Sequence, residues 1–133
     1  MVYLKAMSVV AGCVAVAVSL GVAVGAAERG PLEGTWQLAR TGDRTVEGSA
    51  DQLPFFTITG GKITGFDGCN RFGGPLEDPQ RIVRGQRGCG KGHVELPLDL
   101  GNPAGHLKAG TILGDRLLLP AHGALPESEF RRR

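Results

Sequence analysis

Residues 65–74, Gly-Phe-Asp-Gly-Cys-Asn-Arg-Phe-Gly-Gly, constrain the fold of this chain more than any other stretch. Four glycines, a cysteine and an asparagine occur there beside two phenylalanines. Glycine permits positive φ and close backbone approach, while asparagine tolerates the left-handed conformation and its amide bonds nearby main chain. We therefore interpret the run as a structural turn that Phe66 and Phe72 anchor on its two sides.

The rest of the composition favours short strands and tight turns. The chain of 133 residues has 22 glycines, eight prolines and only seven aromatic residues. This length suits one domain with an appended segment, and we expect a thin, mainly aliphatic core. The predicted fold is mainly β: a small antiparallel β-barrel-like domain of about seven to eight short strands, with one short helix.

Alternating and β-branched segments locate the strands. Gly60-Gly61 between two such segments predicts a two-residue hairpin turn, and Pro103 predicts a short helical turn over residues 104–109. Trp36, on the inward face of the first strand, is expected in the core. The predicted strands cover residues 32–40, 54–59, 62–66, 81–84, 93–100, 111–113, 116–119 and 129–131, with a loop at 41–51 and turn residues at 76–80.

The first 27 residues predict an export or membrane segment, followed by a linker at 28–31 and the domain at 32–133. Residues 6–27 carry no charge, and small residues precede Glu28, which is typical of a cleaved secretory signal. The apolar run is also long enough to span a bilayer as an uncleaved anchor. A third alternative is lipidation, because residues 10–13, Val-Ala-Gly-Cys, fit the pattern before a lipidated cysteine, here Cys13. All three place the domain outside the cytoplasm, either periplasmic, secreted or membrane-anchored.

Cys69 and Cys89 are the disulfide candidates of the domain. A bridge across their 20-residue separation would persist in an exported protein and stabilise it by roughly 3 kcal/mol in the chain-entropy model. Free buried thiols are the alternative. A thiol enzyme is a third interpretation, since Cys89 lies four residues before His93 and imidazole activates thiol nucleophiles. Arg71 or Arg87 could also lower a thiol pKa.

Other chemistries lack their motifs. The formal charge of +2 is spread over interleaved signs, which argues against a nucleic-acid partner. The sequence contains no pair of cysteines or histidines at the spacing of zinc ligands and no Gly-x-Ser-x-Gly motif. Gly60-Gly61-Lys62 lacks the spacing that a phosphate-binding loop requires before its lysine. We expect no catalytic residue, cofactor or metal, and we interpret the three histidines as solvated loop residues. The terminal residues 131–133, all arginine, are expected to form a solvated tail.

The motif Gly68, Cys69, Asn70, Arg71 and Phe72 resembles the central motif of the META domain, the family of HslJ-type heat-shock lipoproteins of the bacterial envelope. Residues 34–38, Gly-Thr-Trp-Gln-Leu, resemble the first strand of that family, and residues 114–119, Gly-Asp-Arg-Leu-Leu-Leu, its late strand. Cys89 follows an arginine-containing run, as the second cysteine of the family tends to. The likeness spans about residues 32–130.

The resemblance implies a small β-barrel-like fold with one helix, an envelope location, a stress-related role and no catalytic residues. This chain departs from the family in three ways. It lacks the usual Thr-Arg pair before Cys89, its interval between the cysteines is short, and Pro97, Gly101 and Pro103 oppose a long helix.

The predicted function is that of a non-enzymatic exported META-like domain with an unknown protein or envelope partner. The membrane is involved only through the N-terminal segment, if that segment is uncleaved or lipidated at Cys13. One alternative is a small barrel that binds an apolar or anionic ligand, with Arg71 near its mouth. In the plainer interpretation, an acid such as Asp67 pairs with Arg71. The other alternative is the thiol enzyme that uses Cys89 and His93.

Overall fold

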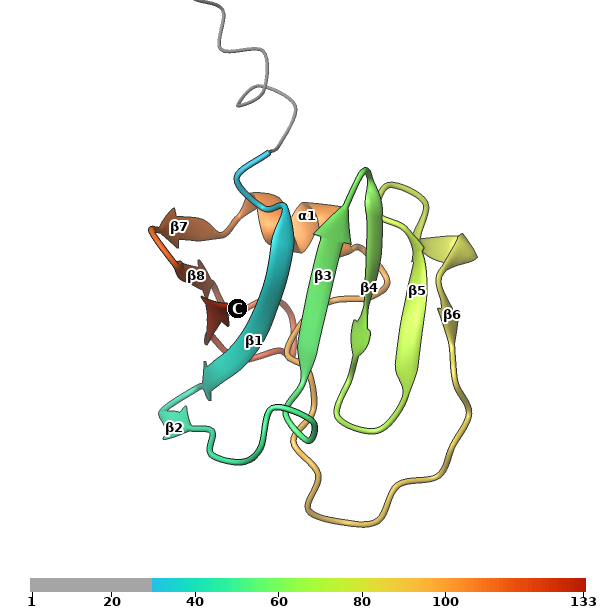
Figure 1. The fold of residues 1–133 in the computed structure, drawn as a ribbon, viewed down its shortest axis with the longest axis vertical. Helices are drawn as coiled ribbons and strands as arrows, with labels where there is room; N and C mark the ends of the chain where they lie inside the picture. Colours follow the sequence, from blue (N-terminus) through green and yellow to red (C-terminus); the bar gives the residue numbers. More distant parts are fainter. Residues whose placement is uncertain (1–29) are drawn as a thin grey trace, which may run out of the picture.

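The structure, a computed structural model, describes residues 30–133. These residues form one antiparallel sheet of nine strands and one short α-helix (Figure 1). The predicted leader at 1–27, the linker residues 28 and 29, and Cys13 lie outside the described residues.

The strands follow one another along the sheet in the order β6-β5-β4-β3-β1-β9-β8-β7, with β2 paired to β1. The mainly β, antiparallel prediction is confirmed. The sheet is open, with β6 and β7 at its ends, so barrel-like is only a loose description of it. The elements are β1 (Gly34–Thr41), β2 (Arg44–Thr45), β3 (Phe55–Thr59), β4 (Lys62–Phe66), β5 (Arg71–Pro75), a 3-10 turn (Pro79–Arg81), β6 (Val83–Arg84), α1 (Pro103–Lys108), β7 (Thr111–Leu113), β8 (Arg116–Leu119) and β9 (Ser128–Arg132).

The β3–β4 hairpin follows the local sequence. Gly60 and Gly61 both have positive φ, 54° and 78°, the combination that a type I′ turn requires. This turn brings Ile58 opposite Ile63 on the buried face of the sheet. The predicted hairpin is therefore confirmed, including the bounds of β4.

The N-terminal and C-terminal strands meet in the middle of the sheet. Leu38 of β1 lies opposite Phe130 of β9, and both are buried. Trp36 is fully buried, donates from Nε1 to the carbonyl of Leu32 at 2.9 Å, and lies under the guanidinium of Arg132, 4.1 Å from the ring centroid. The predicted core position of Trp36 is confirmed.

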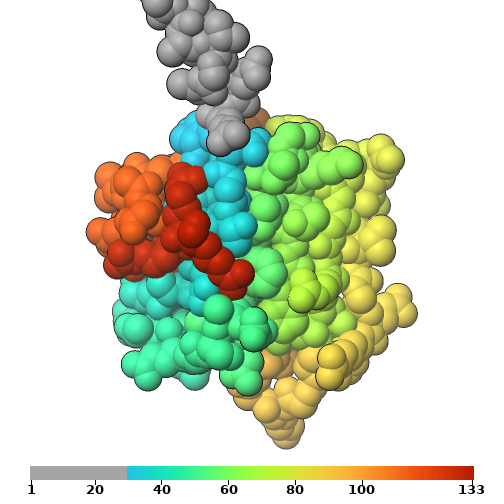
Figure 2. All heavy atoms as spheres, in the orientation of Figure 1, coloured from blue at the N-terminus to red at the C-terminus, as the bar shows by residue number. Residues whose placement is uncertain are grey.

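The prediction of a solvated tail at residues 131–133 is wrong. Two of these arginines end β9, and the backbone N–H of Arg133 donates to the carbonyl of Thr35 at 2.9 Å. Figure 2 shows the last residues (red) lying across the face of the first strand (blue). The backbone pairing of β9 with β1 and the stacking of Arg132 on Trp36 stabilise these arginines in the sheet more than solvation stabilises them in a free tail.

The core lies between the sheet and the helix, and α1 crosses behind the sheet in Figure 1. Asn102 caps α1 by accepting from the N–H of Gly105 at 3.1 Å, and Pro103 occupies the first turn, as expected. The short helical turn is confirmed. The buried hydrophobic cluster comprises Trp36, Leu38, Phe56, Ile58, Ile63, Phe72, Leu96, Leu98, Leu107, Leu117, Leu119 and Phe130.

The strand predicted at residues 93–100 is wrong. Residues 93–100, expected as an edge strand, have no strand assignment, although Leu96 and Leu98 point into the core as their alternation predicted. Pro97 has no N–H to donate to a ladder, and the segment is instead held by the N–H of Leu96 on the carbonyl of Asp67, 2.9 Å. Residues 73–75, which precede the expected turn at 76–80, belong to β5 and pair with β4.

Candidate functional site: the motif turn and its disulfide

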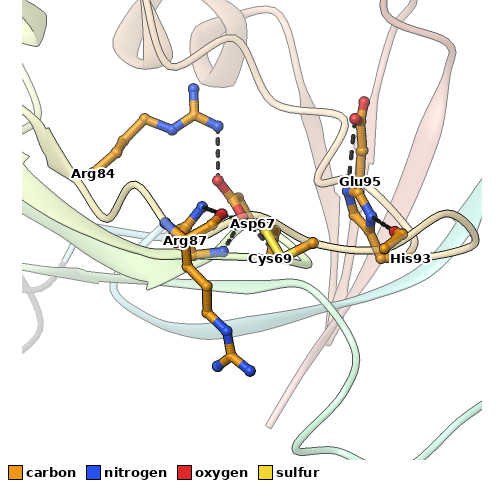
Figure 3. The surroundings of a disulfide bond; sticks show 9 residues. Asp67, Cys69, Arg84, Arg87, His93 and Glu95 are labelled. Carbon is orange, nitrogen blue, oxygen red and sulfur yellow. Dashed lines mark hydrogen bonds and ion pairs between the residues drawn. A yellow bond between two sulfur atoms is a disulfide. The ribbon is translucent and has the colours of Figure 1, made fainter.

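The structure joins Cys69 and Cys89 in a disulfide with a Cα–Cα distance of 5.7 Å. Cys69 lies in the turn between β4 and β5 (Figure 3). Cys89 lies in the long loop between β6 and α1. Cys69 is partly buried and Cys89 is exposed. The bond therefore ties the loop to the motif turn, and both sulfur atoms of the domain are committed to it.

Asp67 organises the motif turn. Its Oδ1 accepts from the backbone N–H groups of Cys69 and Asn70 at 2.8 and 2.6 Å, and its Oδ2 accepts from Nη2 of Arg84 at 2.7 Å. Burial alone would raise the pKa of this carboxyl, but the bonds from Asn70, Arg84 and Cys69 outweigh burial and lower the pKa below its usual value. The expected pairing of Asp67 with Arg71 is wrong, because Arg84 is the partner.

Asn70 holds the disulfide loop from the other side. Its Nδ2 donates to the carbonyl of Arg87 at 3.0 Å, and its Oδ1 accepts from the N–H of Arg87 at 2.8 Å. The side-chain amide thus pairs with the peptide groups of one residue much as a neighbouring strand would. The N–H of Gly85 also donates to the carbonyl of Arg71 at 3.0 Å. The side-chain and backbone bonds together fix the start of the loop against β5.

Gly68 and Phe72 complete the structural role of the motif. Gly68 has φ of 101°, and a Cβ atom there would overlap the carbonyl oxygen of Val94. Phe72, the first buried residue of β5, lies in the core. Phe66 lies on the opposite face of the sheet from Phe72 and is only partly buried, so only one of the two phenylalanines anchors the turn in the core.

Arg71 and Arg87 differ from the other motif residues. Both are exposed, and within residues 30–133 neither guanidinium has a hydrogen bond or an ion pair. In Figure 3 the side chain of Arg87 extends away from the disulfide. These are the side chains of the site that remain available for an external partner.

His93, the proposed partner of Cys89, makes other contacts. Its Nδ1 lies 3.0 Å from the carbonyl of Gly90 and its Nε2 lies 3.8 Å from Oε1 of Glu95 (Figure 3). The ring is on the surface of the same loop as the cysteine. The expectation of solvated loop histidines therefore fits His93.

For His106 that expectation is wrong. His106 is fully buried in α1, where its Nδ1 accepts from the N–H of Asp99 at 3.1 Å and its Nε2 faces the carbonyl of Pro120 at 3.2 Å. Its ring stacks on that of His122 with 4.6 Å between centroids, and Nε2 of His122 lies 3.1 Å from Oδ2 of Asp99. Burial lowers the pKa of His106, and the nearby His122 acts in the same direction.

The sequence carries a faint signal for this cluster. His106 occupies one helical turn after Pro103, so it shares the short helix with the buried Leu107. The adjacent residues do not indicate that Asp99 and His122 contact His106, because loops separate both residues from the helix in the sequence.

Two surface cavities lie beside the disulfide. One, of about 680 Å³, has Asp67, Arg84, His93, Asp99 and His122 in its wall. The other, of about 630 Å³, is lined by Phe55, Phe66, Asn70, Arg71, Arg87 and Arg133 among others. In the cavity of about 680 Å³, Arg84 pairs with Asp67 and His122 lies beside Asp99. The cavity of about 630 Å³ contains more cationic than acidic side chains.

Among residues 30–133, no three side chains of His, Cys, Asp or Glu are grouped so that they could hold a metal ion. In the same part of the chain, no helix combines the length and apolar character needed to cross a membrane. Comparisons with protein-family models, with curated proteins and with solved structures find no match to this chain.

Proposed function

We propose that the chain is a non-enzymatic, exported binding domain of META type that works at the bacterial cell envelope and is stabilised by one disulfide. The observation that carries this proposal is the use of the motif residues. Asp67, Gly68, Cys69 and Asn70 are all occupied with holding the turn and its loop. Because the polar groups of the motif form hydrogen bonds within the domain, the motif is suited to a structural role that fixes the shape of the surface around it.

The disulfide argues against the thiol enzyme. A cysteine nucleophile acts as a thiolate, which a sulfur in a disulfide cannot supply. His93 contacts Gly90 and Glu95, so its position is explained without a catalytic role. Both observations favour binding over catalysis for this part of the molecule.

The disulfide and the leader both support export. Disulfides persist in oxidising compartments and are rare in the cytosol. The uncharged segment at residues 6–27 is typical of a signal or anchor. In this proposal the domain folds outside the cytoplasm and contacts a protein or envelope partner there, in a stress-related role that the META resemblance implies.

Intact-mass analysis of the protein recovered from a bacterial envelope fraction tests the proposal. The protein is measured before and after reduction with alkylation. We expect a chain that begins at Ala27 or Glu28, lighter than its reduced form by two hydrogen atoms. A chain that begins at Cys13 with added acyl groups would also support export, as a lipoprotein.

Two outcomes would overturn the proposal. Two alkylatable thiols in the unreduced domain would restore the enzymatic alternative. Recovery of the unprocessed chain from the cytosol alone would refute export. A matched variant, Cys13→Ser, separates lipidation from cleavage, because the replacement removes the acyl mass of a lipidated protein but leaves the mass of a chain that begins at Ala27 or Glu28 unchanged.

A further inference from the structure

The second cavity beside the disulfide has an aromatic wall. Phe55 of β3 lies opposite Phe66 of β4, and their ring centroids are 6.5 Å apart at an interplanar angle of 37°. Both residues lie on the face of the sheet opposite the core, because their neighbours Phe56 and Gly65 are the buried ones. The pair therefore presents flat apolar surface outside the core.

Three arginines line the same cavity as these rings. The guanidinium of Arg133 lies over Phe55, 4.5 Å from its centroid, and is fixed by bonds to Oε1 of Gln37 and the carbonyl of Ala50. Arg71 and Arg87 line the same cavity with guanidinium groups that bond to no described residue. We call this space, between Phe55, Phe66, Arg71, Arg87 and Arg133, the arginine cavity.

The charge of the arginine cavity is unbalanced. Asp51 is the one acidic side chain in its wall, against three arginines. The neighbouring cavity differs, since Arg84 there is neutralised by Asp67 at 2.7 Å. Unpaired guanidinium groups bind carboxylates through two parallel hydrogen bonds, which a lysine cannot reproduce.

Hydrogen bonds fix the backbone of both unpaired arginines, Arg71 and Arg87. The peptide groups of Arg87 are bonded on both sides by the Asn70 amide, and the carbonyl of Arg71 accepts from Gly85. The disulfide closes the same loop two residues beyond Arg87. This reduces the backbone entropy that ligand binding would otherwise cost.

We propose that the arginine cavity binds a small aromatic carboxylate, with its acid group on Arg71 and Arg87 and its ring against Phe55 and Phe66. The cavity volume, about 630 Å³, falls within the range of small-molecule sites. The inference rests on the proposed non-catalytic role and names the class of ligand for it. It also gives the disulfide and Asn70 a function, because they position the arginines.

Titration of the oxidised full-length chain, purified in mild detergent, tests the proposal. The probes are benzoate, its neutral analogue benzamide, and inorganic phosphate, followed by amide chemical shifts and calorimetry. We expect saturable binding of benzoate with shifts at Phe55, Phe66 and Arg87, and at least tenfold weaker binding of the other two probes. Benzamide lacks the charge, and phosphate lacks the ring.

The variant is Arg71→Gln with Arg87→Gln. Its matched control is Arg44→Gln with Arg81→Gln, which removes the same charge from two exposed arginines outside the cavity. Loss of the charged bonds should weaken benzoate binding at least about tenfold in the variant, while the control stays within about twofold of the parent.

Three results would overturn the inference: no saturable binding of benzoate, equal weakening in variant and control, or phosphate binding as tight as benzoate. Disulfide mass and thermal melting of each protein establish that it is folded. Failure here leaves the proposed function standing if the mass shows an exported, oxidised domain. Free thiols in that mass would instead refute the proposed function.

Discussion

Gly68 is the residue in the motif turn with the strictest steric requirement. It has positive φ, and a methyl group there would overlap the carbonyl oxygen of Val94. We expect Gly68→Ala to lower the free energy of unfolding by about 3 kcal/mol, from backbone strain and displacement of the Val94 segment. Urea unfolding of the oxidised chain measures this change.

Gly90→Ala is the control for that substitution. Gly90 lies in the same disulfide loop, and nothing lies within 4 Å of a Cβ atom there. We expect a change of at most about 0.5 kcal/mol. Equal effects of the two substitutions would show that the Gly68 position is not constrained by its contact with Val94.

His106 should make the stability depend on pH. Its pKa in the folded chain is lowered, chiefly by burial, whereas an unfolded histidine has a pKa of about 6.5. Between these two values the unfolded chain binds a proton that the folded chain does not. The free energy of unfolding therefore falls as the pH falls from about 6.5 through the lowered pKa, and it is fully retained above about 6.5.

Urea midpoints between about pH 7.5 and pH 5 measure this dependence. We expect His106→Gln to be less stable than the parent at neutral pH but to lose stability less steeply on acidification. His93→Gln, at an exposed site, should keep the parental slope. Asp67 titrates at lower pH because its own pKa is lowered, so it does not account for this window. An unchanged slope in His106→Gln would contradict the prediction.

At the residue scale, prediction from sequence succeeds where the cause is local. The glycine pair at 60–61 and Pro103 at the start of the short helix act on their own backbone, and both effects are predicted from the adjacent residues. The burial of His106 depends on Pro120 and His122, and the partner of Asp67 is an arginine 17 residues away. Such contacts have no local signal, so the candidate site was only partly predictable.

At the scale of elements, the disulfide loop depends on Asn70 for its first contact with β5. The substitution Asn70→Ala removes both hydrogen bonds between the Asn70 amide and the peptide groups of Arg87. We expect it to lower the free energy of unfolding by about 1–3 kcal/mol. It should also speed hydrogen exchange at the Arg87 amide, which loses its acceptor.

Asn102→Ala supplies the comparison. It removes the cap of α1 and should cost about 1 kcal/mol, yet leave exchange at Arg87 unchanged. If the Arg87 amide exchanged equally in both variants, the disulfide alone would be sufficient to order the loop.

Residues 93–100 show why the type of an element can be predicted wrongly although its buried residues are predicted correctly. Alternation identified Leu96 and Leu98 as buried, and they are. Strand assignment needs a bonding partner as well, and this segment finds one backbone bond to Asp67 and a side-chain bond from the Asp99 N–H to His106. Alternation reports burial, while the partner is set by the whole fold.

At the scale of the molecule, the sheet is completed by its last strand. β9 lies between β1 and β8, so residues from the two ends of the domain pair at its centre. The mainly β class could be predicted because many short alternating segments require it. The open sheet and its strand order could not, because they depend on pairings between segments far apart in the sequence.

The disulfide lies away from this central pairing, and that separation predicts the effect of reducing it. Opening the Cys69–Cys89 bond frees the loop, and the loss of its 20-residue closure should cost about 3 kcal/mol. The β1–β9 pairing involves neither cysteine, so the reduced, alkylated chain should keep its far-ultraviolet circular dichroism. Urea unfolding of the oxidised and reduced forms, with amide exchange, measures both effects.

Protection should be lost around Arg87 and retained at Leu38 and Phe130. Cys13→Ser, which leaves the bridge intact, should behave like the parent. Complete unfolding on reduction would show that the sheet needs the bridge to form. Equal stability of the two forms would show that Asn70 and Asp67 hold the loop in place without the disulfide.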